Sequence, residues 1–413
     1  MILRGRRRDT AYTLSLKTDS LSVAININTV SVYDRAGRLY SLYKEGRHHR
    51  RSLSGQALQK WTEADRRQRR WLAQTAADQL IDTAADQLRR LLDALSAPDW
   101  QWLTPPDHPA QLREVITVIE RGARFDCAAA RLDAARFAEV YSPIGMLPPD
   151  QYLALVLQAT DGCSFNTCTF CDLYHQAFRV KTPAEFRQHI RQALDYLGDS
   201  ILLRQRSIFL GAANALAIPM ARLVSMLAII REECGGKHSE RREAASRNAP
   251  RGVYAFLDAF TGTRKSVEDY RALADLGLKR VYIGLESGHD PLLQFVQKPG
   301  QAADAIATVR AIKAAGLNVG VIVLIGLGGD RFAAGHTRDT IAALNQMQPG
   351  DGDLIYCSDL VEEAGTLYPQ LAAQHDLRAL SATERAAQRA AIHSRLNLNG
   401  AKVSNYDVRE FVY

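Results

Sequence analysis

Short apolar segments alternate with amphipathic ones over the stretch from residue 152 to residue 358. The apolar segments are rich in Val, Ile and Leu, which is typical of parallel strands that are covered on both faces. We expect strands at 152–159, 207–210, 253–260, 280–285, 318–325 and 353–358, separated by helices at 183–196, 220–233, 266–276, 302–315 and 337–347. Because parallel strands are joined by right-handed crossovers, about six such units predict an α/β fold, a partial (β/α)6 barrel.

The first hundred residues follow a different pattern. Apolar and polar residues alternate in short runs at 11–45, with turn signals between the runs, which predicts a small antiparallel sheet of hairpins. Residues 57–96 carry apolar side chains at helical spacing, so we expect a helical segment there. The stretch 235–250 is expected to be an exposed loop.

These patterns divide the chain into four parts. We expect a small basic α+β domain at 1–100, a helical linker at 101–149, the barrel at 150–378, and a C-terminal helical and extended tail at 379–413.

The net charge of +7 lies in the N-terminal part, because residues 1–100 hold 18 Lys and Arg against 11 Asp and Glu. Such a surface either binds an anionic partner, RNA or a phosphorylated small molecule, or is simply a solvated basic face. No apolar run approaches the ~20 residues that span a bilayer. The first residues lack the apolar core of a signal peptide, so we expect a cytoplasmic protein with no membrane partner.

Three of the six cysteines, Cys163, Cys168 and Cys171, lie within one short loop after the first barrel strand. Three thiolates on one loop can bind three irons of a [4Fe–4S] cube and leave the fourth iron open. A structural zinc knuckle with His175 as a fourth ligand is the alternative, and it would suit an RNA-binding protein. A disulfide is disfavoured because the other cysteines are scattered and cytosolic thiols stay reduced.

The loop sequence GCSFNTCTFCDLY at 162–174 resembles the cluster loop of radical S-adenosylmethionine (SAM) enzymes, in a sub-group with C-x4-C-x2-C spacing. Later segments resemble that family's motifs in the same order, and the resemblance covers about residues 150–370. Residues 207–216 resemble its glycine-rich strand end, 280–288 its G-x-E-S-G strand, and 321–329 the apolar strand beside adenine. All of these segments follow predicted strands, so they should meet at the carboxyl-terminal mouth of the barrel.

The resemblance implies a role for each matching residue. Cys163, Cys168 and Cys171 would bind the [4Fe–4S] cluster. SAM would contact Phe170, Gly211, Ala212, Ala213, Asn214, Glu286, Ser287, Ile325 and Gly326. Most relatives have Gly-Gly-Glu where this chain has Gly-Ala-Ala-Asn, so the carboxylate of that motif is missing here.

The chemistry that the resemblance implies is reductive cleavage of SAM to methionine and a 5′-deoxyadenosyl radical. The radical would abstract hydrogen from a substrate that the sequence does not identify, and an electron donor such as flavodoxin or ferredoxin would reduce the cluster. One alternative is a radical SAM enzyme that acts on RNA and docks through its basic N-terminal domain. The other is the RNA-binding protein with a zinc knuckle.

Cys357 is a further candidate for catalysis. It lies near the end of the last predicted barrel strand, where alternation sends Tyr356 and Cys357 to opposite faces. If Cys357 faces the mouth of the barrel, its thiol could return a hydrogen atom to a substrate radical. The alternative is a small buried side chain, which is common for free cysteine.

Overall fold

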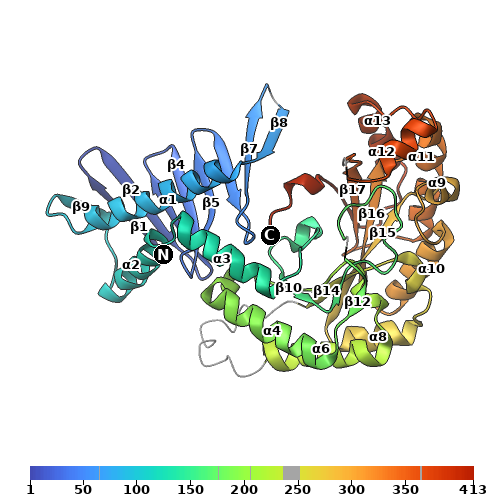
Figure 1. The fold of residues 1–413 in the computed structure, drawn as a ribbon, viewed down its shortest axis with the longest axis horizontal. Helices are drawn as coiled ribbons and strands as arrows, with labels where there is room; N and C mark the ends of the chain where they lie inside the picture. The colour runs from blue at the N-terminus through green and yellow to red at the C-terminus, as the bar shows by residue number, and fades with distance from the viewer. Residues whose placement is uncertain (65, 175, 205, 236–251, 363–364) are drawn as a thin grey trace. The chain divides into compact units, whose positions relative to one another are not determined.

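The computed structural model describes residues 1–413 except 65, 175, 205, 236–251 and 363–364, so part of the expected loop at 235–250 lies outside the described residues. The chain forms two compact units (Figure 1). The N-terminal unit comprises Met1–Pro143, Gln192–Arg206 and Val412–Tyr413, and the barrel unit comprises Ile144–Arg191 and Ser207–Phe411. Within the described ranges, no helix is both long and apolar enough to cross a bilayer.

The N-terminal unit is built on an antiparallel sheet that, over the described residues, has nine strands in the order β8-β7-β6-β5-β4-β3-β2-β1-β9. Alternating apolar residues give this sheet one buried face, on which Leu3 pairs with Leu14 and Leu14 with Val23. The hairpins predicted at 11–45 are confirmed. The strands are β1 (Ile2–Arg7), β2 (Thr10–Leu16), β3 (Ser20–Ile25), β4 (Thr29–Asp34), β5 (Leu39–Lys44), β6 (Arg47–Arg51), β7 (Ala57–Glu63), β8 (Arg66–Trp71) and β9 (Trp100–Thr104).

Helices α1 (Gln74–Leu95), α2 (Pro109–Ala123) and α3 (Cys127–Val140) belong to this unit. Their apolar residues, among them Leu88 and Ile119, form one core with the buried face of β1–β5. The helix expected at 57–96 is wrong for its first part, because residues 57–71 form the β7–β8 hairpin. Spacing within this segment does not reveal that it pairs with β6. Strand β9, α2 and α3 also belong to this unit, where we had expected a separate linker.

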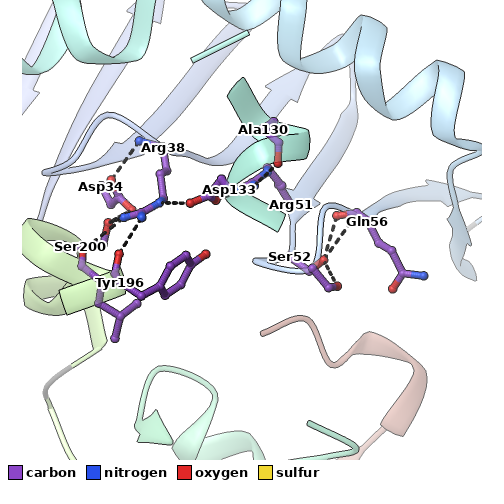
Figure 2. Close-up of polar contacts among 11 residues, drawn as sticks. Asp34, Arg38, Arg51, Ser52, Gln56, Ala130, Asp133, Tyr196 and Ser200 are labelled. Carbon is purple, nitrogen blue, oxygen red and sulfur yellow. Dashed lines mark hydrogen bonds and ion pairs between the residues drawn. The ribbon is translucent and has the colours of Figure 1, made fainter. Parts of the chain in front are cut away.

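A buried charge network ties the sheet to α3 and to the 192–206 segment (Figure 2). Arg38 Nε donates to Asp133 Oδ1 at 2.7 Å, and an Arg51 guanidinium nitrogen donates to Asp133 Oδ2 at 2.8 Å. Arg38 also donates to the carbonyl oxygen of Tyr196 at 2.8 Å. Only 8% of the Asp133 side chain is exposed, and the buried Asp34 carboxylate also interacts with Arg38, so two buried carboxylates balance the two guanidinium groups.

Replacing Asp133 with Asn is therefore expected to destabilise the N-terminal unit by about 3–5 kcal/mol, because the buried Arg51 loses its ion-pair partner and Arg38 loses one of its two carboxylates. All four tryptophans lie in this unit, so urea unfolding followed by tryptophan fluorescence reports on it directly. The matched control is Asp86→Asn, which breaks the exposed pair with Arg89 and should cost less than ~1 kcal/mol. Equal effects of the two substitutions would show that the buried network contributes no more than a surface pair.

The barrel unit contains a parallel sheet that, over the described residues, has seven strands in the order β10-β13-β14-β15-β16-β17-β18. The six predicted strands are confirmed, and β18 adds a seventh where we had expected an extended tail. The strands are β10 (Leu155–Gln158), β13 (Ile208–Gly211), β14 (Val253–Leu257), β15 (Leu278–Glu286), β16 (Asn318–Ile325), β17 (Leu354–Asp359) and β18 (Lys402–Tyr406). An all-parallel sheet with helical crossovers is the predicted partial barrel.

Helices follow most of the strands, as the sequence pattern predicts. They are α4 (Pro183–Leu197), whose residues from Gln192 belong to the N-terminal unit, α6 (Met220–Gly235), α8 (Val267–Asp275), α10 (Ala302–Ala314), α11 (Gly329–Gln346) and α13 (Ala382–His393). Helix α11 begins at Gly329 rather than at residue 337, directly after Gly328, which has the positive φ of 80° that glycine tolerates.

A layer of aromatic side chains fills the barrel near the amino ends of its strands. The hydroxyls of Tyr282 and Tyr356 each donate to Asp150 at 2.6 Å, and Arg280 donates to the same carboxylate at 2.9 Å. The rings of Tyr282 and Phe209 lie 6.1 Å apart. This layer closes one end of the barrel, so open space is expected at the carboxyl ends of the strands.

Candidate active site

A cavity of about 270 Å³ lies in the barrel unit beyond the aromatic layer. The cavity is lined by the inward-facing residues that follow the aromatic layer on two strands. These are Gly284, two residues after Tyr282 on β15, and Ser358, two residues after Tyr356 on β17. Cys163, Cys168 and Cys171 line the same cavity. The structure therefore brings the cysteine loop to the carboxyl ends of the strands, where ligands bind in barrels of this kind.

The base of the cysteine loop is closed by a small ladder and a glycine. Strands β11 (Thr160–Asp161) and β12 (Arg179–Val180) pair across it. Asp161 accepts hydrogen bonds from Lys181 at 2.6 Å and from Arg179 at 3.0 Å. Gly162 has a φ of +69°, and a Cβ there would lie 2.3 Å from the carbonyl oxygen of Gln176. Only glycine fits this position, so the loop leaves the strand at a fixed angle.

The far side of the loop is attached to the chain after α9 (Asp290–Phe295). The Thr169 N–H donates to the carbonyl oxygen of Val296 at 3.0 Å. The hydroxyl of Thr167 donates to the carbonyl oxygen of Gln297 at 3.0 Å. Because both ends of the loop are anchored, its three cysteines are positioned by the fold.

The three thiols are free, with Cys171 exposed and Cys163 and Cys168 partly exposed. Burial raises the pKa of Cys168 to about 11, against the opposing effect of Lys298. The pKa of Cys171 is also raised, because the surrounding protein desolvates its thiol although the side chain reaches the surface. Thiols bind metals as thiolates, so binding of a metal cluster here would release protons and depend on pH.

The number of thiols on the loop fits a four-iron cube, which binds each thiolate through a different iron and leaves one iron open. A zinc site needs a fourth ligand. Among the described residues, no group of three or more His, Cys, Asp or Glu side chains is placed to hold a metal ion. His175, the fourth ligand considered for zinc, lies outside the described residues.

A buried ion pair lies beside the cysteines. Lys298 Nζ is 3.7 Å from Glu286 Oε1, and each side chain is 14% exposed. Burial raises the pKa of Glu286, which Lys298 only partly offsets. Burial alone would lower the pKa of Lys298, but Glu286 and the nearby thiols raise it above its usual value. The pair thus places a cation between a carboxylate and the thiols.

The backbone is shaped around Glu286. This residue has a φ of +60°, in the left-handed region that few non-glycine residues adopt. The position of its carboxylate also requires a glycine at residue 284, because a Cβ there would lie 2.4 Å from Glu286 Oε1. Gly284 therefore leaves the space in which the Glu286 carboxylate reaches the cavity.

Asn214 links three loops at the mouth of the barrel. Its amide donates to the Ser164 hydroxyl of the cysteine loop at 2.8 Å, and its carbonyl oxygen accepts from the Asp258 N–H at 3.0 Å. The Asp258 carboxylate in turn accepts from the Thr261 N–H at 2.7 Å and caps the short helix α7 (Ala259–Gly262). Asn214 thus holds the cysteine loop against the ends of β13 and β14.

The structure brings together part of the predicted set. The residues that line the cavity are Cys163, Cys168, Cys171, Phe170, Ala213, Asn214 and Glu286. The predicted residues that do not line it are Gly211, Ala212, Ser287, Ile325, Gly326 and Cys357. Strand alternation explains Ile325: Ile322 and Leu324 face the cavity, so Ile325 is buried on the opposite face of β16.

The other residues outside the cavity wall have structural partners. The N–H of Ala212, just after Gly211, donates to the Thr160 hydroxyl at 3.0 Å, and the Gly326 N–H donates to Gln388 Oε1 at 2.8 Å. Ser287 is fully buried beside His336, whose Nδ1 lies 2.7 Å from the serine hydroxyl. These contacts hold the strand ends in place.

His336 predicts a pH dependence of stability. Burial, aided by His289, lowers the pKa of His336 to about 4. The unfolded chain therefore binds a proton near pH 6.5 that the folded protein does not accept, and stability falls as the pH drops from about 6.5 to about 4. The contribution is about 3 kcal/mol. Urea midpoints measured by circular dichroism across this range should fall less steeply in His336→Gln, and parallel curves would contradict the assignment.

Cys357 is 1% exposed and lies on the outer face of β17. Tyr356 is the neighbour that points into the barrel, as its bond to Asp150 shows. Burial raises the pKa of Cys357 to about 11, although Arg389 of α13 opposes this. The placement matches the alternative of a small buried side chain, and we assign Cys357 no part in the cavity.

Several wall residues escaped the sequence analysis, among them Lys298, Tyr406 and Met146. Lys298 lies in a Lys-Pro-Gly turn that gave no sign of its carboxylate partner. Tyr406 comes from β18, and its hydroxyl lies 3.8 Å from Met146 Sδ. The sequence Lys-Val-Ser-Asn-Tyr at 402–406 has no polar–apolar alternation, so no local pattern identified this strand.

Comparison with known proteins gives one family. Residues 157–334 match the model of the Radical SAM superfamily. No curated protein matches the chain.

Several solved structures are similar over part of the chain. The [FeFe]-hydrogenase maturase HydG is 17% identical, with 78% of this chain and 62% of that chain covered and a TM-score of 0.39. The Escherichia coli coproporphyrinogen III oxidase HemN is 14% identical, with 62% and 54% covered and a TM-score of 0.37. The cobalamin-dependent enzyme OxsB is 13% identical, with 58% and 31% covered and a TM-score of 0.36. The chain thus spans less than two thirds of each structure, and these distant likenesses carry no argument about its activity.

Proposed function

We propose that this chain, whose residues 157–334 form a radical SAM domain, is an enzyme that reductively cleaves SAM to abstract hydrogen from a substrate. The cofactors of such a domain are a [4Fe–4S] cluster and SAM. The observation that carries the proposal is the convergence of Cys163, Cys168 and Cys171 with Glu286 on one cavity at the carboxyl ends of the barrel strands.

Each group of residues has a task in this proposal. The thiolates of Cys163, Cys168 and Cys171 would hold the cluster and leave one iron open to SAM. When bound, the reduced cluster supplies the electron that breaks a C–S bond of SAM. Glu286 accepts hydrogen bonds from SAM, and Lys298 keeps that buried carboxylate charged. Phe170 packs beside the adenine, with Leu324 of β16 taking the place predicted for Ile325.

The remaining walls favour radical chemistry by excluding water. Phe256, Ile322 and Leu360 are among the apolar residues of the cavity, and Tyr406 closes the side formed by β18. A water-poor cavity protects a reactive intermediate from side reactions. The enzyme would also need a one-electron donor, and flavodoxin or ferredoxin would suit that task.

The direct test is anaerobic reconstitution of the full chain with iron and sulfide, followed by reduction in the presence of SAM. We expect a brown protein with a broad absorption band near ~400 nm, and slow formation of 5′-deoxyadenosine and methionine even without substrate. A colourless protein that retains zinc after the same treatment, or a brown protein that leaves SAM intact, would contradict the proposal.

A further inference from the structure

The positive charge of the chain is concentrated in one part of the N-terminal sheet. Residues 39–71, which form β5 to β8, contain nine Lys and Arg against three Asp and Glu. This excess of six accounts for nearly all of the net charge of +7. The core of the N-terminal unit takes its sheet residues from β1 to β5, so β6, β7 and β8 extend beyond the part that the core cluster covers.

Strand register gathers a defined set of side chains on one face of β6–β8. His49 pairs with Gln59, Gln59 with Arg70, and Trp61 with Gln68. Paired residues share a face, and so do residues two apart on one strand. Arg51 and Ala57 lie on the same face but are buried. We call the rest of the set the β6–β8 surface: Arg47, His49, Gln59, Trp61, Glu63, Arg66, Gln68 and Arg70.

Trp61 is the centre of this surface. The guanidinium carbons of Arg47 and Arg70 lie 5.3 Å and 5.7 Å from the centre of its ring. Both arginines donate to Gln59 Oε1, at 3.3 Å and 2.9 Å, and Gln59 Nε2 lies 2.7 Å from His49 Nε2. The neutral Gln59 amide therefore holds both arginines beside the indole before any ligand arrives.

The arginines keep their positive charge available. Among the described residues, the hydrogen bonds of Arg47 and Arg70 go to an amide and not to a carboxylate. Glu63 is the one acid of the surface, and it accepts from the indole N–H of Trp61 at 3.4 Å. Both arginines are exposed, as is Arg66. A basic edge strand alone could serve to prevent sheet pairing, but that role does not require an indole between two guanidinium groups.

We propose that the β6–β8 surface binds single-stranded nucleic acid. Guanidinium groups bind phosphate oxygens in a bidentate manner and also stack on bases. Arg47, Arg66 and Arg70 contact phosphates, and a base stacks on the layer formed by the Trp61 indole and its guanidinium neighbours. A sheet that presents arginines around an aromatic ring offers both contacts to an unpaired strand, whereas the bases of a duplex are stacked on one another and cannot reach the indole.

The test measures binding of the full-length protein to a fluorescein-labelled RNA of about twelve mixed nucleotides, by anisotropy. Labelled heparin serves as a polyanion without bases. Trp61→Ala is expected to weaken RNA binding roughly 5- to 150-fold and to leave heparin binding unchanged. The double substitution Arg47→Gln and Arg70→Gln should weaken the binding of both RNA and heparin. It should also reduce the slope of log RNA affinity against log salt concentration by about 1.4.

The matched control is Arg90→Gln combined with Arg113→Gln, which removes the same charge from exposed positions on α1 and α2. This double substitution should change RNA affinity by less than about twofold relative to the wild type, because salt screens long-range charge effects. Trp61→Phe and Trp61→Leu form a second pair of similar size: the phenyl ring should retain most of the affinity and the leucine should not. Thermal melting confirms that each variant is folded.

The proposal would be overturned if Trp61→Leu bound RNA as tightly as Trp61→Phe. It would also be overturned if the control double substitution reduced RNA affinity as much as the Arg47 and Arg70 double substitution. Tighter binding of the protein to anionic vesicles than to RNA would contradict it as well. The measurement needs neither the cluster nor SAM. Its outcome is therefore independent of the proposed chemistry in the barrel unit.

Discussion

Replacing Cys168 with Ala is expected to abolish cluster binding and to lower SAM cleavage at least ~100-fold, because one iron loses its protein ligand. Iron and sulfide content after anaerobic reconstitution, and 5′-deoxyadenosine measured by chromatography, check the two effects. The same loss is expected for Cys163→Ala and Cys171→Ala, since all three thiols line one cavity.

The matched controls are cysteines elsewhere in the chain. Cys127→Ala changes a partly exposed cysteine at the start of α3, and Cys357→Ala changes the buried cysteine on the outer face of β17. Both proteins should bind as much iron as the wild type and cleave SAM at its rate. A Cys168→Ala protein with full iron content and full cleavage would end the assignment of the cysteine loop.

Replacing Glu286 with Gln is expected to weaken SAM binding roughly 10- to 100-fold while iron content stays unchanged, because a hydrogen bond to a charged group contributes about 1.5–3 kcal/mol. Gly284→Ala should act in the same direction, since its Cβ would occupy the place of Glu286 Oε1. Equilibrium dialysis of the reconstituted proteins with labelled SAM measures both.

Glu268→Gln is the control for charge, because Glu268 is 77% exposed on α8 and should leave SAM affinity unaltered. Lys298→Met tests the ion pair separately. It removes the buried partner of Glu286, so we expect weaker SAM binding that becomes stronger as the pH rises and the carboxylate ionises. Unchanged affinity in both Glu286→Gln and Gly284→Ala would remove Glu286 from the SAM site.

The sequence predicts the fold best where strands are buried and helices are amphipathic. Apolar runs such as 318–325 can only be satisfied inside a covered sheet, and all six predicted barrel strands are present. The prediction fails where pairing, rather than local pattern, decides. Residues 57–71 form a hairpin because β7 pairs with β6, and β18 is a strand because it pairs with β17. Neither partner can be identified from spacing within the segment itself.

The site divides along similar lines. The cysteines, Phe170 and Glu286 are found from local motifs, and all of them line the cavity. Lys298 was missed because its importance arises from a neighbour twelve positions away in the chain, Glu286. Ile325 and Cys357 were candidates because they lie at strand ends, but the phase of alternation turns both away from the cavity. That phase is set by how β16 and β17 pack between the helices and the barrel interior.

The central claim is that the cysteine loop holds a cluster with one iron open to SAM. Electron paramagnetic resonance of the reduced, reconstituted protein tests it most directly, with and without SAM. We expect the signal of a reduced [4Fe–4S] cluster whose line shape changes when SAM is added, because the open iron gains new ligands. In Glu286→Gln the same change in line shape should appear, but only at a higher SAM concentration. Cys168→Ala should give no cluster signal at all. A spectrum that SAM does not alter, or a wild-type protein with no cluster signal, would contradict the account.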